Sequence, residues 1–265
     1  MKRYSPPAAK QRGMAIISAL LIAAVVAVLA GAMLTRQTVF TRSLEAEQLR
    51  IQGQWLLQGG LERSRQMLWD ARQKDVLTRL DQPWARAQGG AFEGRIVDEQ
   101  GKFNLRNLVN RQQVDSEQLQ SFERLCRLIG VDPTVSRRIS QRVIASYEPP
   151  AKYPMLRSLD DLSGIEGLDP NLLQRMQAYI SVLPGPTWVN GNTASAEVLS
   201  AVVPQLSLAQ ARGLLAERDS GRWFINRGDF VNRLHLPQVA VDSVQVGIPA
   251  SGFACRARHG ASSVG

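Results

Sequence analysis

The sequence predicts an α+β protein in which one long N-terminal helix precedes a small β-element and a large helical region. Three patterns predict this class. An uncharged apolar run passes directly into a helical pattern that meets no proline before Pro83. A short strand-and-turn pattern follows over residues 92–108, and from Asp115 to Leu236 nearly every segment reads as a short capped helix.

The apolar run covers Met14–Leu34 and contains no charged residue. As a helix it reaches about 30 Å, the thickness of the hydrocarbon core of a bilayer. Lysines and arginines at positions 2, 3, 10 and 12 precede it, so we predict a cytoplasmic N-terminus and a translocated remainder. Two alternatives stay open: a signal anchor, and a removable secretory signal with a weak cleavage site at Ala30–Ala32.

The helical pattern continues beyond the apolar run, because large apolar residues recur there at near-helical spacing. We therefore predict a single helix, half within the membrane and half amphipathic. The recurring residues are Leu44, Leu49, Trp55, Leu56, Leu57, Leu61, Met67 and Leu68.

A β-hairpin is predicted next. Gly89-Gly90 opens this segment, residues 92–97 read as a strand, "DEQG" as a turn, and residues 103–108 resume the apolar pattern. Asp98 and Glu99 form adjacent carboxylates, which acid–base chemistry would also require. With no histidine, lysine or serine motif beside them, we interpret the pair as part of the turn.

The region from Asp115 to Leu236 predicts a helical domain of roughly 120 residues. Expected helix starts are Asp115-Ser116, Asp132-Pro133, Asn192 or Thr193, and Ser207, since these residue types cap helix N-termini. "EPPAKYP" reads as a linker, and "SLDDLSGIEGLDPNLLQRMQAYISVLPGP" as helix, glycine turn and helix.

Part of this region resembles helix-hairpin-helix DNA-binding modules: "VNGNTASAEVLSAVV" followed by "AQARGLLAERDSGRWFINRGDFVNRL". In such modules a glycine hairpin lets backbone N–H groups approach a phosphate. Here the hairpin position reads "VVPQLSL", and the earlier "LSGIEGLD" keeps Gly164 and Gly167 but adds Glu166 and Asp169. We therefore expect a packing or protein-interaction role and no nucleic acid. A membrane-anchored DNA-binding protein is the alternative function.

Composition excludes several other classes. The net charge of +9 is spread along the chain without a polybasic block, which is typical of a solvated surface. Two cysteines and two histidines give neither a disulfide scaffold nor zinc-type spacing. No phosphate loop or nucleophile–base spacing is present, so we do not predict an enzyme. Whether Cys126 and Cys255 pair stays open.

The basic leader ends in Gly13, and the apolar helix begins at the next residue, Met14. This junction resembles the type IV prepilin signal. The resemblance implies that an aspartyl prepilin peptidase cleaves between Gly13 and Met14 and that the new Met14 amine is methylated. Most such proteins carry glutamate at the fifth mature position, thought to neutralise the amine of the subunit above, whereas this chain has Ser18. That substitution suits a subunit with nothing above it, at a filament tip. The alternative is that Ser18 simply bonds to its own backbone.

Together with "DEQGKFNL", "RSLDDLSGIEGLD", "VNGNTAS" and "GRWFINRGDF", this leader resembles the general secretion pathway protein K family, over about Arg12 to Val246. The resemblance implies a pilin-like fold: a long helix packed on a small antiparallel sheet, with a large all-α domain inserted after the first strand. The implied domains are the leader 1–13, the transmembrane half-helix 14–35, the periplasmic helix and first strands 36–109, the inserted helices 110–236 and the return to the sheet 237–265.

The family resemblance also implies a function. It is that of a minor pseudopilin of the type II secretion system, anchored in the inner membrane by one pass with its bulk in the periplasm. Such a subunit forms a tip complex with minor pseudopilins I and J, contacts other pseudopilins, and supports export of folded proteins without catalysing a reaction. Calcium is implied as a ligand, with no residues assigned. The return to the sheet, with Val241, Val244 and Val246 alternating, ends in the polar "ACRARHGASSVG", so we expect a shortened sheet.

Overall fold

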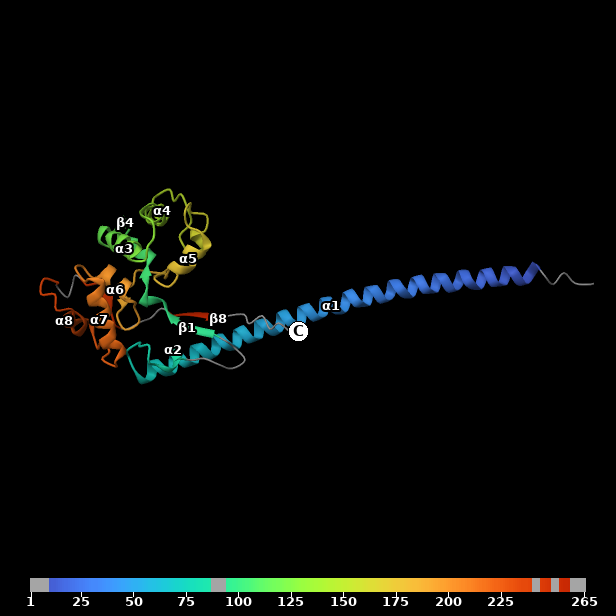
Figure 1. The fold of residues 1–265 in the computed structure, drawn as a ribbon, viewed down its shortest axis with the longest axis horizontal. Helices are drawn as coiled ribbons and strands as arrows, with labels where there is room; N and C mark the ends of the chain where they lie inside the picture. Colours follow the sequence, from blue (N-terminus) through green and yellow to red (C-terminus); the bar gives the residue numbers. More distant parts are fainter. Residues whose placement is uncertain (1–9, 87–93, 240–243, 249–252, 258–265) are drawn as a thin grey trace, which may run out of the picture. The chain divides into compact units, whose positions relative to one another are not determined.

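The computed structural model describes residues 10–86, 94–239, 244–248 and 253–257. The structure is helix-rich with small sheets, and α1 (Lys10–Lys74) is one unbroken helix (Figure 1). This confirms the predicted α+β class and the single long helix. The chain divides into two compact units, residues 1–59 and residues 60–265.

The second unit holds the remaining elements, most of them short. The helices are α2 (Pro83–Arg86), α3 (Ser116–Leu128), α4 (Pro133–Ile144), α5 (Pro170–Met176), α6 (Ala196–Val202), α7 (Leu208–Asp219) and α8 (Arg227–Leu234). The 3-10 helices are η1 (Glu99–Gly101), η2 (Leu105–Leu108) and η3 (Leu159–Leu162). The strands are β1 (Gly94–Asp98), β2 (Phe103–Asn104), β3 (Val109–Asn110), β4 (Gln113–Val114), β5 (Ile180–Ser181), β6 (Val189–Asn190), β7 (Val246–Gly247) and β8 (Phe253–Ala257).

The predicted hairpin between residues 92–97 and 103–108 is wrong. β1 pairs antiparallel with β8, and β2 pairs in parallel with β5. "DEQG" does form a turn, but as the right-handed η1 with Asp98 as its N-cap, whereas tight hairpins need turns with positive φ. Phe103 is buried in the helical core, and residues 105–108 continue as η2. Gly89, Gly90, Phe92 and Glu93 lie outside the described residues.

The C-terminal segment also differs from the prediction. The expected return at Val244–Val246 contains β7, which pairs in parallel with β6 and not with β1. The strand that completes β1 is β8, with Cys255 opposite Ile96, inside the stretch we expected to be a polar end. Residues 253–257 therefore form a strand through their backbone hydrogen bonds with β1, despite the polar composition of this segment. Val241 and residues 258–265 lie outside the described residues.

The helix starts follow the capping prediction at three of four places. Asp115, Asp132 and Ser207 are the N-caps of α3, α4 and α7, each accepting backbone N–H groups through its side chain. The cap of α6 is Ser195, not Asn192 or Thr193, because those two side chains bind other segments. Nor is the region 110–236 all-α, since β4, β5 and β6 lie there.

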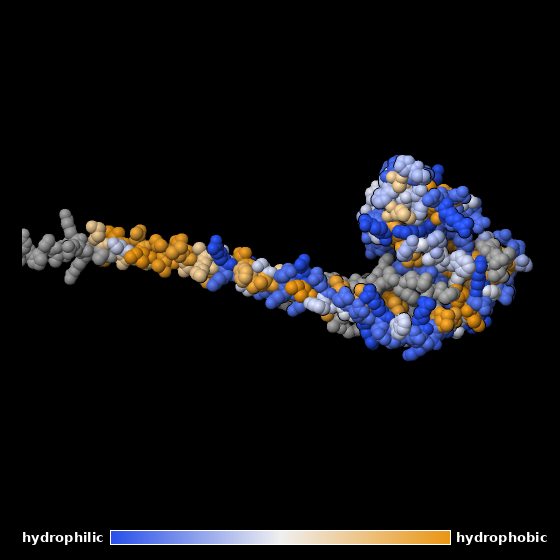
Figure 2. Space-filling view, turned by 180° about the vertical axis from the view of Figure 1, so that it is seen from behind, coloured by the Kyte–Doolittle hydropathy of each residue, from blue (hydrophilic) through white to orange (hydrophobic). Residues whose placement is uncertain are grey.

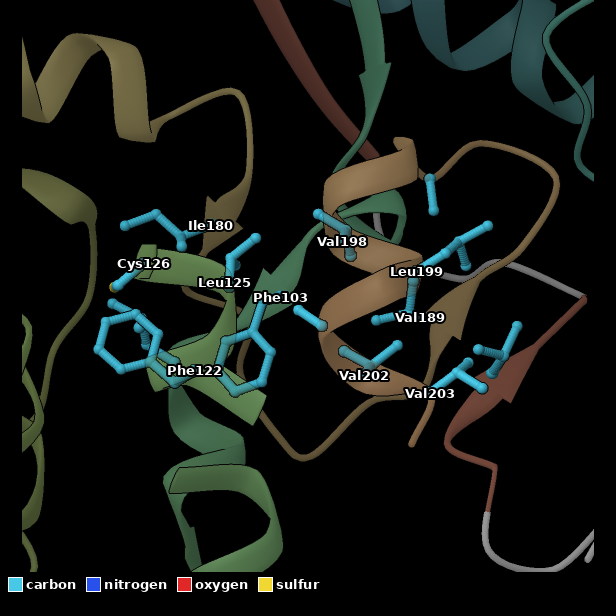
Figure 3. Close-up of a cluster of buried hydrophobic side chains, with 14 of the residues drawn as sticks. Phe103, Phe122, Leu125, Cys126, Ile180, Val189, Val198, Leu199, Val202 and Val203 are labelled. Atoms are coloured by element: carbon cyan, nitrogen blue, oxygen red, sulfur yellow. The ribbon is translucent and has the colours of Figure 1, made fainter. Parts of the chain in front are cut away.

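One hydrophobic core runs through the helical region. α3 packs against α6 and α4, and α6 against α7. Figure 3 shows Phe103 between Phe122 of α3 and Val202 of α6. The Phe103 and Phe122 rings pack with centroids 5.7 Å apart. The apolar face of α3 thus joins the segment after β1 to helices about a hundred residues later.

Candidate functional site

The first candidate site is the N-terminal part of α1. Gly13, Met14 and Ser18 all lie within the helix, which begins at Lys10. The segment Ile16–Lys74 is long enough to cross a membrane, with a mean hydropathy of 2.7 in its most apolar window and none of that window buried. In Figure 2 apolar residues dominate the first part of this helix, and polar residues alternate with them further along. A membrane would cover the exposed apolar side chains.

Ser18 bonds to its own helix. Its Oγ donates to the Met14 carbonyl oxygen at 2.9 Å. Within a single chain, Ser18 therefore makes the contact that the alternative interpretation expects, a hydrogen bond to its own helix backbone. A serine hydroxyl is neutral, so residue 18 offers no negative charge to a neighbouring amine. The cleavage and methylation predicted at Gly13 and Met14 concern covalent chemistry and stay predictions.

The second candidate site is a buried polar network that joins the sequence motifs. Asp98, at the end of β1, is 4% exposed. Its Oδ1 accepts from the Gln100 backbone N–H at 3.0 Å. Its Oδ2 accepts from Asn190 Nδ2 at 2.8 Å and from Thr193 Oγ1 at 2.7 Å. The Asp98 carboxylate thus links "DEQGKFNL" to "VNGNTAS" through hydrogen bonds.

Burial raises the pKa of Asp98 above its ordinary value of 3.8, and the neighbouring charge of Glu99 adds to this. The hydrogen bonds from Thr193, Asn190 and Gln100 lower the pKa and offset part of the effect. Among the described residues no cation pairs with Asp98. The charge is therefore held by hydrogen bonds alone, which makes each donor important.

The two motifs also touch through their backbones. A Cβ added at Gly101 would lie 2.8 Å from Thr193 Oγ1 and 2.9 Å from the Thr193 carbonyl. Beside it, Lys102 Nζ and Glu99 Oε1 form a buried ion pair at 2.6 Å. Ser181 Oγ donates to the Glu99 carbonyl oxygen at 3.2 Å, which connects η1 to β5. Glycine is required at residue 101 by this close approach.

The third motif, "GRWFINRGDF", joins the network through Asn192. The Asn192 side chain donates to the Phe224 carbonyl at 2.8 Å and accepts from the Phe224 N–H at 2.9 Å. Arg218, 4% exposed, donates to the carbonyls of Gly191 and Ala194 and pairs with Asp219 at 2.9 Å. Three of the four motifs recognised in the sequence, "DEQGKFNL", "VNGNTAS" and "GRWFINRGDF", therefore meet at one buried place.

The sequence does not predict this network. From the sequence, Asp98 is expected in a turn, Asn192 or Thr193 is expected as a helix cap, and Asn190 has no expected role. The signal that could have found it is the density of asparagine and threonine in "VNGNTAS" between apolar segments, since buried amides need partners.

The two hairpins that resembled DNA-binding modules differ from one another. Gly164 and Gly167 have φ of +93° and +87°. Glycine adopts these positive φ values readily because it has no Cβ. Glu166, between the two glycines, pairs with Arg138 at 2.7 Å, so this turn carries a carboxylate, which disfavours a phosphate. The connection from α6 to α7 contains no glycine and uses Gln205 at φ 63°.

Metal and thiol chemistry finds little support within the described ranges. They contain no group of three or more histidine, cysteine, aspartate or glutamate side chains placed to hold a metal ion. The calcium implied by the family resemblance therefore stays a prediction without ligands. Cys126 is a free, buried thiol, and burial raises its pKa to about 12.

Comparison with known proteins gives consistent matches. Two family models described as type II secretion system (T2SS), protein K, match residues 101–185 and 189–248, together more than half of the chain. The type II secretion system protein K of Pseudomonas aeruginosa is 29% identical over 265 aligned residues, covering 86% of this chain and 78% of the relative. That of Klebsiella pneumoniae is 28% identical, covering 81% and 77%.

A solved structure shares the fold. A chain in the crystal structure of the GspK-GspI-GspJ complex from the enterotoxigenic Escherichia coli type 2 secretion system superposes with a TM-score of 0.61 and 16% identity. The match covers 80% of this chain and 87% of that one. The motifs that meet around Asp98 and Asn192 lie largely inside the matched family regions. The chain belongs to the type II secretion system protein K family.

Proposed function

We propose that this chain is a minor pseudopilin that forms and caps the tip of the periplasmic pseudopilus, and so supports export of folded proteins across the outer membrane. The proposal rests on the combination of two features in one chain. An exposed apolar helix of membrane-spanning length comes first in the sequence. The chain also has the fold of a chain from the GspK-GspI-GspJ complex. Its partners would be minor pseudopilins I and J, together with other pseudopilins.

The pilin-like arrangement is part of the proposal. In it, α1 would supply the filament helix, and the β1–β8 pair would belong to the small antiparallel sheet. All of α3 to α8 lie in the chain between those two paired strands, as expected of an insertion. A bulky insertion on the last subunit would block further subunits from stacking above it.

The membrane topology and processing complete the proposal. The segment 14–35 would span the inner membrane with the N-terminus in the cytoplasm and the bulk of the chain in the periplasm. The prepilin peptidase would cleave between Gly13 and Met14, and the Met14 amine would be methylated. Ser18 supports the terminal position, since a serine in place of the usual glutamate brings no negative charge to the amine of a subunit above.

Intact mass of the protein purified from membranes tests the processing step. We expect loss of residues 1–13 and gain of one methyl group in cells that have the prepilin peptidase, and an unprocessed chain in cells without it. Gly13→Asp should block the loss in cells that have the peptidase. A cut near Ala32, or no cut in either strain, would remove the pseudopilin proposal.

Co-purification tests the partners. Tagged full-length protein should retain minor pseudopilins I and J after solubilisation in mild detergent. The DNA-binding alternative makes the opposite prediction, namely salt-dependent binding of duplex DNA by a protein that retains neither partner.

A further inference from the structure

The motif "GRWFINRGDF" carries exposed side chains as well as the residue that joins the buried network. Phe224 points into the core, where its ring packs edge-on against Phe230 with the centroids 4.9 Å apart. Ile225, the next residue, is 67% exposed. A single exposed isoleucine is common on protein surfaces, so its surroundings decide whether it has a role.

The backbone on both sides of Ile225 is fixed by side chains from other parts of the same unit. The Asn192 side chain binds both the N–H and the carbonyl of Phe224. Asp229 Oδ2 accepts from the Ile225 N–H at 3.0 Å, and Arg233 donates to the carbonyls of the two residues before Phe224. A segment held in this way has little freedom left to lose when a partner binds, so Ile225 is presented ready for contact.

Arg227 and Trp188 lie next to Ile225. The backbone of Asn226 is extended, with φ −155° and ψ 176°, so the side chains of Ile225 and Arg227 leave the chain on the same side. The Arg227 guanidinium lies over the Trp188 ring, 4.5 Å from its centroid. Trp188 is itself 53% exposed. These three residues, Trp188, Ile225 and Arg227, are called the Trp188 surface below.

Arg227 is a cation without a carboxylate partner among the residues that the structure describes. Its Nη2 donates to the Val244 carbonyl oxygen at 2.6 Å, and its buried Nε has no hydrogen-bond partner there. The neighbouring Arg222 and Arg233 differ, since each pairs with a carboxylate of this chain. Because an arginine stays charged, Arg227 favours a negatively charged group supplied from outside the chain.

We propose that the Trp188 surface is the docking site for a neighbouring minor pseudopilin of the tip complex, whose contact segment places a carboxylate on Arg227 and an apolar side chain against Ile225 and Trp188. This inference rests on the proposed function. Charge complementarity selects an acidic segment, because Arg227 brings a cation that the described part of this chain does not pair. Tryptophan and arginine are also the residues that contribute most to binding at protein interfaces.

Substitution of Ile225 tests the surface without touching a hydrogen bond of the side chains around it. The tagged full-length chain is co-expressed with minor pseudopilins I and J, and the retained partners are quantified after solubilisation in mild detergent. Ile225→Glu should lower retention of the docked partner about tenfold, since it removes an apolar contact and brings a carboxylate to an acidic segment. Ile225→Lys removes the same contact without that repulsion, so its loss should be several-fold smaller.

Val114→Glu is the matched control, because Val114 is also exposed, at 48%, in β4 of the same unit. This variant should retain the partners as the unsubstituted chain does, and all three variants should keep the Tm of the unsubstituted chain. A benzoylphenylalanine photocrosslinker at residue 225 should link the chain to pseudopilin I or J, and the same probe at residue 114 should link it to neither.

The outcomes separate this inference from the proposed function. If the unsubstituted chain retains its partners and Ile225→Glu retains them equally well, or if residue 225 gives no crosslink, the docking site is wrong and the proposed function stands. Equal losses with Ile225→Glu and Ile225→Lys would overturn the acidic contact segment. Retention of neither minor pseudopilin by the unsubstituted chain would remove the proposed function and the docking site together.

Discussion

Removing a single hydroxyl, with Thr193→Val, tests whether the Asp98 network holds the fold. The substitution keeps the size and branching of the side chain but takes away the donor that lies 2.7 Å from Asp98 Oδ2. A hydrogen bond to a charged group contributes about 1.5–3 kcal/mol, and the remaining donor from Asn190 cannot satisfy both lone pairs. For a folded unit of this size, that loss lowers Tm by about 3–12 °C.

The assay is thermal unfolding of the full-length protein in detergent, followed by near-ultraviolet circular dichroism. Thr38→Val is the control, because it makes the same change at an exposed residue of α1 and should alter stability by less than about 0.5 kcal/mol. If the two variants unfold at the same temperature, the network around Asp98 carries no stability and its role here is wrong.

The pH dependence of the stability of Thr193→Val tests whether the lost stability involves the Asp98 carboxylate. The pKa of Asp98 is raised in the folded protein, so its stability contribution is fully present below the ordinary value of 3.8 and is lost as pH rises through the folded pKa. Thr193→Val removes a hydrogen bond that lowers this pKa, which moves the folded pKa further up. The stability deficit of the variant should therefore shrink as pH falls from neutral toward 3.8. A deficit that stays constant over that range would point to lost packing rather than to the carboxylate.

Three single residues carry further predictions. Gly101→Ala should destabilise the protein by about 1–3 kcal/mol in a denaturant titration, because its Cβ would lie 2.8–2.9 Å from Thr193. Cys126, buried and with its pKa raised to about 12, should resist thiol reagents at pH 8 in the folded protein and react once denaturant is added; rapid labelling of that thiol in the folded state would contradict its burial. Ser18→Glu should reduce secretion or change pseudopilus length, measured by a secretion assay and electron microscopy, and normal values of both would argue against the tip position.

The sequence predicted the parts of the fold that depend on local signals. The length of α1 follows from an apolar run that continues in a helical pattern without proline, and the starts of α3, α4 and α7 follow from Asp115, Asp132 and Ser207. In each case the residues that decide the structure are within a few positions of it.

Strand pairing could not be predicted in the same way. β1 finds its partner at Phe253–Ala257, about 160 residues later, and no local pattern in the intervening chain indicates that pairing. A hairpin with the nearest strand-like segment was the local choice, and it failed because Phe103 is buried against Phe122 of α3. The buried network was missed for the same reason, since Asp98 and Asn190 are 92 residues apart.

The contact between the end of β1 and the segment that begins with β6 is better made by polar groups than by apolar ones. β6 is only two residues long, and a strand that short fixes its register weakly. Apolar contacts are non-directional, and volume-conserving changes in a core are tolerated. A buried carboxylate with three donors allows one placement of Asn190 and Thr193 relative to β1, because any shift leaves a buried charge short of a partner. The motifs that identify the family are thus short and polar where the chain must return to one exact position after the helices. In a denaturant titration, Asn190→Leu should destabilise the protein far more than Leu125→Met, a volume-conserving change in the apolar core.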